Sequence, residues 1–369
     1  MLRCKSIIFL EILFFVCYVY SISVPQASDQ IRFFCNFFKE KRFMTLRLAT
    51  GLWVYSNAQD RFCAEGYRES TRIQDIIPAI AKQKSIKAVE LQQTDITPEM
   101  PVKEVKRLLK ENGLACSAVS TSLCHSRRFA LAGFAQQHQK TRNAAIDEGR
   151  KAVEIARALG TTEVTLRLYT DGFDYPFHVD YTTHWNTVIS SIKTIAKFAS
   201  PDVNVAVDYK PRGPRKYLTI SSVGKALSMC QEIAMKNVGV AINFSHAIMA
   251  GEVPAESIAF LSRAGKLFQV YISDSYSYWD DMMIPGSLHL WETLEALFYL
   301  KAAKHRGYIT LDIQPQRMDP THALQIAIGN LAILWKKLEK LDAAEMRKAQ
   351  RTLDATESQR IIRRILLQG

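Results

Sequence analysis

Four segments rich in apolar and β-branched residues end in polar side chains that could bind a cation or move a proton. Their terminal polar residues are Asp208, Asn243, Asp274 and Asp312, and His246 lies three residues after the second of them. Carboxylates that lie close together repel one another unless protons or a cation neutralise them. Oxygen ligands with a histidine nearby therefore predict a divalent cation site. The alternative is that each residue only caps the helix that follows its strand.

Two further charged residues could act on a bound molecule. Lys210 lies two residues after Asp208, so both side chains lie on one face if the strand continues. Its ammonium could bind a hydroxyl or carbonyl oxygen, or it could simply pair with Asp208. Glu90 ends an earlier apolar segment and is a candidate acid, with a solvated turn residue as the alternative.

The segments that position these residues alternate between short strands and longer helices. The clearest helix is Thr141–Leu159, which Gly160 ends, and Thr182–Ala199 and Leu288–Ala303 are two more. The candidate strands are Leu46–Val54, Lys87–Leu91, Leu114–Ser120, Glu163–Tyr169, Val203–Asp208, Val238–Asn243, Phe268–Ser273 and Tyr308–Ile313. Eight strands with intervening helices predict an α/β fold, a (β/α)8 TIM barrel with extra C-terminal helices. An open doubly wound sheet is the alternative, but the turn after Val54 lacks its usual glycines.

The two ends of the chain differ from the body. Residues 1–43 contain an apolar run, residues 7–24, that could be a signal or a membrane anchor, or an upstream extension before a start at Met44. The barrel is expected over residues 44–341, and a basic amphipathic C-terminal helix over residues 342–369. Such a helix could cover the barrel wall or bridge subunits of a homo-oligomer. A cytoplasmic location is favoured, with export or anchoring as the alternative if residues 7–24 are retained.

Composition excludes several classes of protein. The chain has 369 residues, 48% of them hydrophobic, and 48 Lys plus Arg against 36 Asp plus Glu give a formal charge of +12. This composition excludes a disordered tail protein and a polytopic membrane protein. The positive charge is spread without a dense Lys/Arg run, so no nucleic-acid partner is expected. Seven cysteines without a CxxC pair indicate reduced thiols.

Motifs along the body resemble those of the xylose isomerase-like TIM barrel family, and among them the rhamnose isomerase-like sugar isomerases. The resemblance runs from Met44 to about Leu341. The matching stretches are Asp60–Tyr67, Asp171–Phe177, Asp208–Arg212, Asn237–Val240 with His246 and Ala250–Glu252, Trp279–Asp281 with Ile284–Ser287, and Leu311–Ile313. The resemblance implies a small sugar as the substrate.

The resemblance also implies a divalent cation, most often Mn²⁺, with Co²⁺ or Mg²⁺ as alternatives. Family members hold it with an acid on the fifth strand, an Asp on the sixth, a His on the seventh and an acid on the eighth. The matching residues here are Asp208, Asn243, Tyr271 and Asp312. Two anionic ligands remain where the family has three, so we expect weak binding. Asp280 matches an acid near a second cation.

The implied reaction is aldose–ketose isomerisation or epimerisation, assisted by the cation. The residues expected to carry it are Asp208, Lys210 and His246. The residues expected to contact the sugar are Trp53, Glu90, Asp174, Phe177, Tyr271, Asp274 and Trp279. The alternative function is a catalytically impaired barrel that binds a sugar as a sensor or scaffold.

Overall fold

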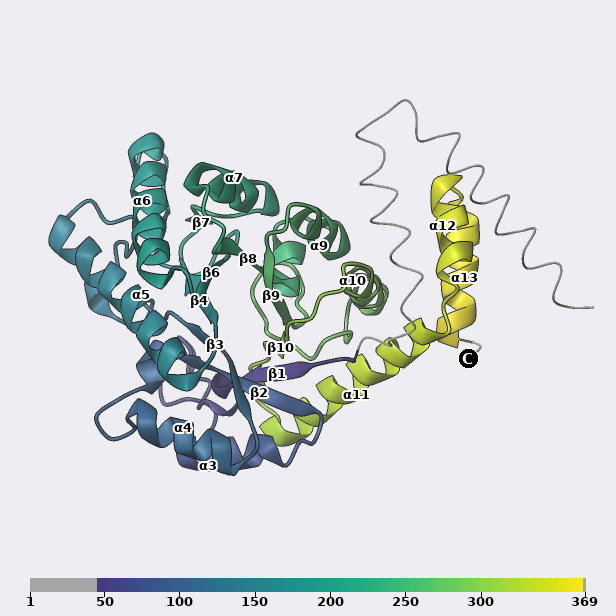
Figure 1. Ribbon diagram of the computed structural model, residues 1–369, viewed down its shortest axis with the longest axis horizontal. Coiled ribbons are helices and arrows are strands. Elements are labelled where there is room, and N and C mark those ends of the chain that lie inside the picture. The colour runs from purple at the N-terminus through teal and green to yellow at the C-terminus, as the bar shows by residue number, and fades with distance from the viewer. Residues whose placement is uncertain (1–44, 368–369) are drawn as a thin grey trace, which may run out of the picture. The chain divides into compact units, whose positions relative to one another are not determined.

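The computed structural model describes residues 45–367, so the predictions for residues 1–43 lie outside the described part. Eight parallel strands close into a barrel in the order β1-β10-β9-β8-β6-β4-β3-β2, and helices surround it (Figure 1). The barrel strands are β1 (Leu48–Gly51), β2 (Ile86–Gln92), β3 (Ala115–Ser120), β4 (Glu163–Arg167), β6 (Asn204–Asp208), β8 (Val238–Asn243), β9 (Leu267–Ile272) and β10 (Ile309–Leu311). The predicted TIM barrel is confirmed.

Each predicted strand contributes one barrel strand, and the predicted helices are also present. The helices of the body are α3 (Ile73–Ala81), α4 (Val102–Glu111), α5 (Gln139–Leu159), α6 (Tyr181–Ala199), α7 (Val223–Ile233), α8 (Phe244–Met249), α9 (Pro254–Arg263), α10 (Leu290–Ala302) and α11 (Pro320–Glu339). Short 3-10 helices are η2 (Leu52–Tyr55), η3 (Gln93–Asp95) and η4 (Arg127–Phe129), and β5 (Gly172–Phe173) pairs with β7 (Tyr217–Leu218) outside the barrel. None of the helices in residues 45–367 is long and apolar enough to span a membrane.

Local sequence explains where the helices around the site begin and end. Gly160 adopts a left-handed φ of 81° at the end of α5, a conformation that favours glycine. The carboxylate of Asp180 accepts a hydrogen bond from the backbone of Thr183 at 2.6 Å and so caps the start of α6. These caps fix the outer helices, and the loops that precede them lie at the C-terminal end of the barrel.

The register of the strands places polar residues together above a small apolar layer. Ala206, Ala241 and Tyr271 form a buried cluster in the barrel interior. Side chains alternate along a strand, so Asp208 and Asn243, each two residues further on, also point inward and lie nearer the C-terminal end. This is the end at which TIM barrels carry their active sites.

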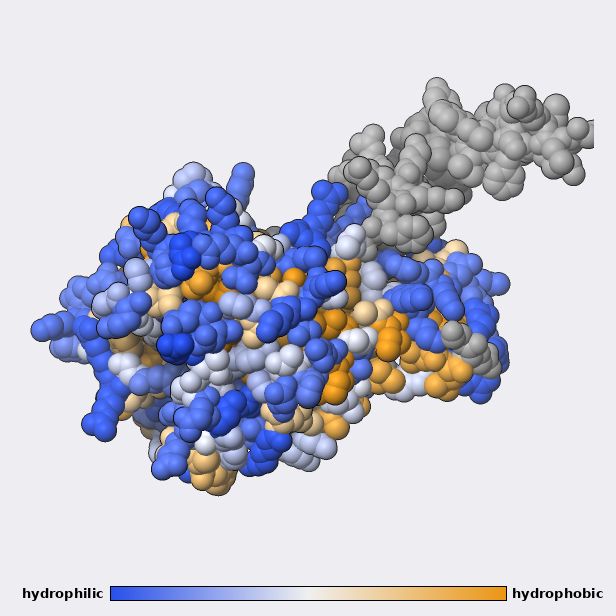
Figure 2. Space-filling model, turned by 90° about the horizontal axis from the view of Figure 1, so that it is seen from below, coloured by the Kyte–Doolittle hydropathy of each residue, from blue (hydrophilic) through white to orange (hydrophobic). Residues whose placement is uncertain are grey.

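The C-terminal segment contains two helices, α12 (Ala343–Arg351) and α13 (Ala355–Leu367), where the sequence pattern predicted one. They pack on each other through Met346, Ala349, Ile361 and Ile365. Figure 2 shows hydrophilic residues over most of the visible face and hydrophobic residues gathered near the C-terminal helices. The hairpin therefore has a small core, against which Phe298 of α10 also packs.

Shortening one side chain of this core should loosen the hairpin alone. Ile361 is fully buried, and Ile361→Ala is expected to destabilise the α12–α13 hairpin by about 2 kcal/mol or more through lost burial and a residual cavity. Hydrogen exchange measured along the chain should then accelerate in α12 and α13 and stay unchanged in the barrel strands. Equal acceleration in both would mean that the hairpin is part of the barrel's cooperative unit.

Candidate functional site

A chain of charged side chains occupies the C-terminal end of the barrel. His246, in α8, lies between two carboxylates: its Nδ1 is 3.0 Å from Asp208 Oδ1 and its Nε2 is 3.1 Å from Asp280 Oδ2. Lys210 Nζ donates to the same Asp280 oxygen at 2.8 Å and lies 4.5 Å from the centre of the Tyr169 ring. The Tyr169 hydroxyl donates to Asp208 Oδ2 at 2.6 Å. These contacts bring all three predicted catalytic residues together.

The charged side chains of this hydrogen-bonded group stabilise one another. Burial alone would lower the pKa of His246, but the charges of Asp208 and Asp280 outweigh it and raise that pKa to about 9. The imidazole is therefore protonated at neutral pH and donates to both carboxylates. Burial alone would raise the pKa of Asp280, whereas Lys210 and His246 hold it well below its usual range.

A second charged pair, Arg167 and Glu90, adjoins the first group, because Arg167 lies next to Asp208 in the pairing of β4 with β6. Arg167 ends β4 and donates to Glu90 Oε1 at 3.2 Å. Its guanidinium lies 4.4 Å from the centre of the Trp53 ring and 5.5 Å from that of Tyr271. Burial raises the pKa of Glu90 to about 7, although the charge of Arg167 opposes the shift. A carboxyl group with this pKa can accept or release a proton at neutral pH.

The order of the strands relates the position of Glu90 to that of His246. Counting from β2, which carries Glu90, four steps along the closed sheet lead to β8, which precedes His246. Four steps in an eight-stranded barrel is half the circumference. The strand that carries Glu90 therefore lies opposite the strand that precedes His246.

Asn243 and Asp312 complete the set of polar and aromatic residues at this end of the barrel. We call this set the ring, and its members are Trp53, Glu90, Arg167, Tyr169, Asp208, Lys210, Asn243, His246, Tyr271, Asp280 and Asp312. Asn243 Nδ2 donates to Asp312 Oδ2 at 2.6 Å, while its Oδ1 accepts the backbone N–H of Ser245 at 3.0 Å and so caps α8. Burial raises the pKa of Asp312 above its ordinary value, against the opposing charge of Arg167. The other oxygen of Asp312, Oδ1, is buried and has no hydrogen-bond partner among the described residues.

The donors at the matched ligand positions do not fit a divalent ion as they are arranged. Both oxygens of Asp208 and the amide oxygen of Asn243 already accept hydrogen bonds. Tyr271 is bonded through its hydroxyl to Thr165 Oγ1 at 2.7 Å, and burial raises its pKa well above the ordinary value, so it stays a neutral phenol. Asp312 Oδ1 is the one oxygen of this set left open. The predicted weak Mn²⁺ site has no support from this geometry.

Asp280, the acid expected near a second cation, and its neighbours are also engaged with one another. Both ring nitrogens of His246 face carboxylates, and Lys210 bonds to Asp280. Asp281 accepts the backbone N–H of Tyr276 at 2.8 Å and so serves its own loop. Across residues 45–367, no three His, Cys, Asp or Glu side chains are grouped so that they could hold a metal ion.

Four predicted contact residues lie outside the ring. Asp274 accepts the backbone N–H groups of Leu288 and His289 in the turn just before α10, and its other oxygen lies 2.7 Å from His289 Nδ1. Asp174 lies in the segment between β5 and α6 and forms an ion pair with Arg215, which lies between β6 and β7. Phe177 is fully exposed and Trp279 is 58% exposed, so neither forms a wall of the ring in this conformation.

Arg167 and Tyr169 are functional candidates that the sequence analysis missed. Both follow from the alternation of β4, which places Thr165, Arg167 and Tyr169 on one face of an extended segment. The residues singled out from the sequence end the second and the last four candidate strands, and the candidate strand Glu163–Tyr169 is not among these. An arginine that ends an apolar strand is a signal that could have been used.

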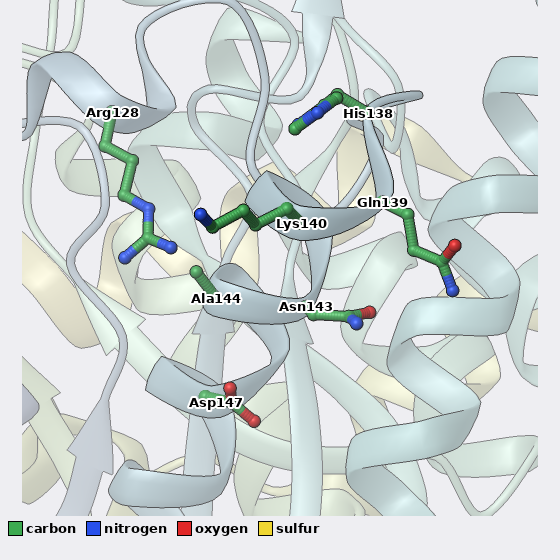
Figure 3. Close-up of a pocket in the computed structure, with 7 residues that line it drawn as sticks. All are labelled: Arg128, His138, Gln139, Lys140, Asn143, Ala144 and Asp147. Atoms are coloured by element: carbon green, nitrogen blue, oxygen red, sulfur yellow. The ribbon is translucent and has the colours of Figure 1, made fainter.

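Two surface hollows lie away from the ring. The first is lined by residues at the start of α5, together with Arg128 from η4 (Figure 3). The second lies among Glu163, Asn204 and residues 262–268 and 303–307, where the barrel strands begin. Neither contains the buried acid–base groups, and chemistry is therefore assigned to the ring rather than to either hollow.

Comparison with known proteins agrees with this fold. A 23% identical relative over 267 residues is a xylose isomerase of Thermus thermophilus, and the match covers 69% of this chain and 68% of that protein. The E. coli 3-keto-D-glucoside 4-epimerase superposes with a TM-score of 0.58 at 17% identity, covering 79% of this chain and 99% of the other. The D-allulose 3-epimerase of Methylomonas sp. gives 0.60 at 16% identity, with 78% and 98% covered.

At sequence identities of 16 to 17%, these structural similarities show only that the fold is shared. The decisive match is that of a family model, described as xylose isomerase-like TIM barrel, to residues 78–329. These residues make up more than half of the chain and include every member of the ring except Trp53. The chain therefore belongs to the xylose isomerase-like TIM barrel family.

Proposed function

We propose that the protein is a sugar isomerase or epimerase that moves a proton at the carbon next to a carbonyl of a small carbohydrate. The proposal rests on one observation above all. Glu90, whose pKa burial raises to about 7, lies on the strand opposite the one that precedes the protonated His246. Proton removal on one face and return on the other need such groups on both sides.

The residues divide the reaction between them. Ionised Glu90 takes the proton from the carbon, and the electrons of the broken C–H bond form the C=C bond of an enediolate. His246 lies between Asp208 and Asp280 and supplies a proton from the other side once the substrate displaces Asp280 from its Nε2–H; a water molecule that enters with the substrate then returns a proton to it. Lys210 lies beside this pair and binds a hydroxyl or carbonyl oxygen. Return of a proton to the opposite face of the same carbon gives an epimer. Delivery to the neighbouring carbon gives an aldose–ketose isomer when the hydroxyl proton of the first carbon also moves to the former carbonyl oxygen.

No step of this scheme passes through a metal. A divalent cation would polarise the carbonyl and stabilise the negative oxygen when bound. The donors at the matched positions are engaged with one another and do not fit such an ion. Metal assistance, which the family resemblance implies, stays a prediction that metal analysis of the purified protein tests.

A sugar-binding sensor or scaffold is the second candidate. Asn243 and Tyr271 stand at two of the positions where the resemblance implies metal ligands. The observation that favours this candidate is that both are already hydrogen-bonded within the protein, to Asp312 and Thr165. Such a protein would bind a ketose in the ring and leave it unchanged.

Solvent deuterium separates the two functions. We expect the protein to convert at least one sugar of a panel of D-allulose, D-tagatose, D-xylose and a 3-keto-D-glucoside. Nuclear magnetic resonance in D₂O should show one deuterium entering the carbon next to the carbonyl, because the proton route exchanges with solvent. Conversion without deuterium would indicate a hydride shift, and binding without conversion would establish the sensor.

A further inference from the structure

We propose that Arg167 takes the place of the divalent cation and, with Trp53, binds the carbonyl oxygen of a neutral, unphosphorylated sugar. The inference rests on the proposed function and names its electrophile and its substrate class. It follows from where the fixed positive charge lies and from which buried polar atoms lack partners.

Arg167 is held rigidly at the C-terminal end of the barrel. The residue is 8% exposed, and its guanidinium lies 4.4 Å from the centre of the Trp53 ring and 5.5 Å from that of the Tyr271 ring. Its charge is permanent, because a guanidinium does not lose its proton in proteins. The phenol ring of Tyr271, at the position of the family's histidine ligand, thus contacts a cation that belongs to the chain itself.

Two donors in this part of the ring have no acceptor. Arg167 Nε and Trp53 Nε1 are both buried, and neither has a hydrogen-bond partner among the described residues. The two side chains are stacked on each other, so their N–H groups belong to one small region. Buried donors without partners are costly, and a ligand oxygen that accepts from both would remove that cost.

Three unpartnered acceptors define the rest of the ligand. Glu90 Oε2, Asp280 Oδ1 and Asp312 Oδ1 are buried carboxylate oxygens without a donor among the described residues. Sugar hydroxyls donate to such oxygens, whereas a phosphate or a second carboxylate would be repelled by them. Two donors and three anionic acceptors therefore match a carbonyl and several hydroxyls, and they disfavour an anionic sugar.

Arg167 then performs the electrostatic part of the reaction. As Glu90 takes the proton, the C=O bond electrons move to oxygen, and the negative oxygen is stabilised by Arg167 and the Trp53 N–H. The charge returns to carbon when the proton is delivered. A preformed cation in a buried site stabilises such an oxygen without reorganisation.

Binding measured by calorimetry tests the inference on the full chain after treatment with a chelator. D-allulose, D-tagatose and D-allulose 6-phosphate serve as probes, each with and without added Mn²⁺. We expect a neutral ketose to bind equally well with and without Mn²⁺ and at least as tightly as the phosphate. Arg167→Met should weaken that binding roughly 10- to 100-fold, the range for a hydrogen bond to a charged group.

Arg157→Met is the matched control. Arg157 also lies over an aromatic ring, 5.2 Å from that of Phe198, and pairs with Asp202, but on the outside of the barrel. It should bind as the wild type does. If Arg167→Met does not fold, the wild-type measurements decide alone.

Three results would overturn the inference: ketose binding that requires Mn²⁺, tighter binding of the phosphate, or binding of none of the probes. Unchanged binding by folded Arg167→Met would do the same. Metal-independent binding without deuterium exchange would instead overturn the proposed function and leave the role of Arg167 in binding intact.

Discussion

Glu90→Gln is expected to lower kcat/KM for the converted sugar by about 10²- to 10⁴-fold, the usual contribution of a general base. The amide is nearly isosteric with the carboxyl group and can still accept from Arg167, but it cannot take a proton. Steady-state kinetics on the variant measure the effect.

The pH profile identifies the group that is lost. Glu90 must be ionised to act as the base, so kcat/KM of the wild type should rise as the pH passes through about 7, the pKa that burial gives this residue. In Glu90→Gln this rise should be absent and the residual rate flat. A rise near pH 7 that persists in the variant would assign the titration to another group and remove Glu90 from the scheme.

Glu163→Gln is the control for this substitution. Glu163 begins the strand that Arg167 ends, and burial raises its pKa too, but it accepts hydrogen bonds from Asn204 and Gln269 at the other end of the barrel. The same chemical change far from the ring should leave kcat/KM and its pH profile as in the wild type.

The fold follows from the sequence because its signals are local. Runs such as Val238–Asn243 are apolar on both faces, as strands covered by helices on one side and packed on the other must be. The same runs also show where polar residues occur, so Asp208, Asn243 and Asp312 could be placed at one end of the barrel before any contact was known. What sequence does not encode locally is the partner of each side chain.

The site shows this limit at several residues. Asp274 follows its strand as Asp208 does, yet it turns to the backbone just before α10 because two N–H groups there need an acceptor. Arg167 was missed since its role depends on Glu90, 77 positions away, and on a ring from η2. Likewise Asn243 looks like a weakened ligand in the sequence, whereas its amide is fully used by Asp312 and Ser245.

The largest effect on stability is expected from Asp280→Asn. Asp280 lies in the loop between β9 and α10, and one of its oxygens accepts from both Lys210 and His246. Both partners are buried, so removing the negative charge leaves two cations without part of their compensation. Loss of one member of a buried ion pair costs about 3 to 5 kcal/mol. Chemical denaturation at pH 7 should show a loss of at least 3 kcal/mol.

The pH dependence of that loss has a defined sign. The pKa of Asp280 lies below its unfolded value of 3.8, so the residue stabilises the fold fully above about pH 4 and less as the pH falls through its lower folded value. The wild type and Asp280→Asn should therefore differ most at neutral pH and converge in acid. Without Asp280, His246 keeps only Asp208 as a counter-ion, and its pKa should fall below the wild-type value of about 9.

Asp281→Asn provides the comparison within the same loop. The neighbouring carboxylate accepts one backbone N–H, that of Tyr276, and an asparagine oxygen can accept the same bond. Its effect on stability should stay within about 0.5 kcal/mol, as for surface substitutions that keep their contacts. If Asp280→Asn cost no more than Asp281→Asn, the Lys210–Asp280–His246 contacts would contribute little to the folded state. The charged chain at the end of the barrel would then be free to rearrange around a ligand.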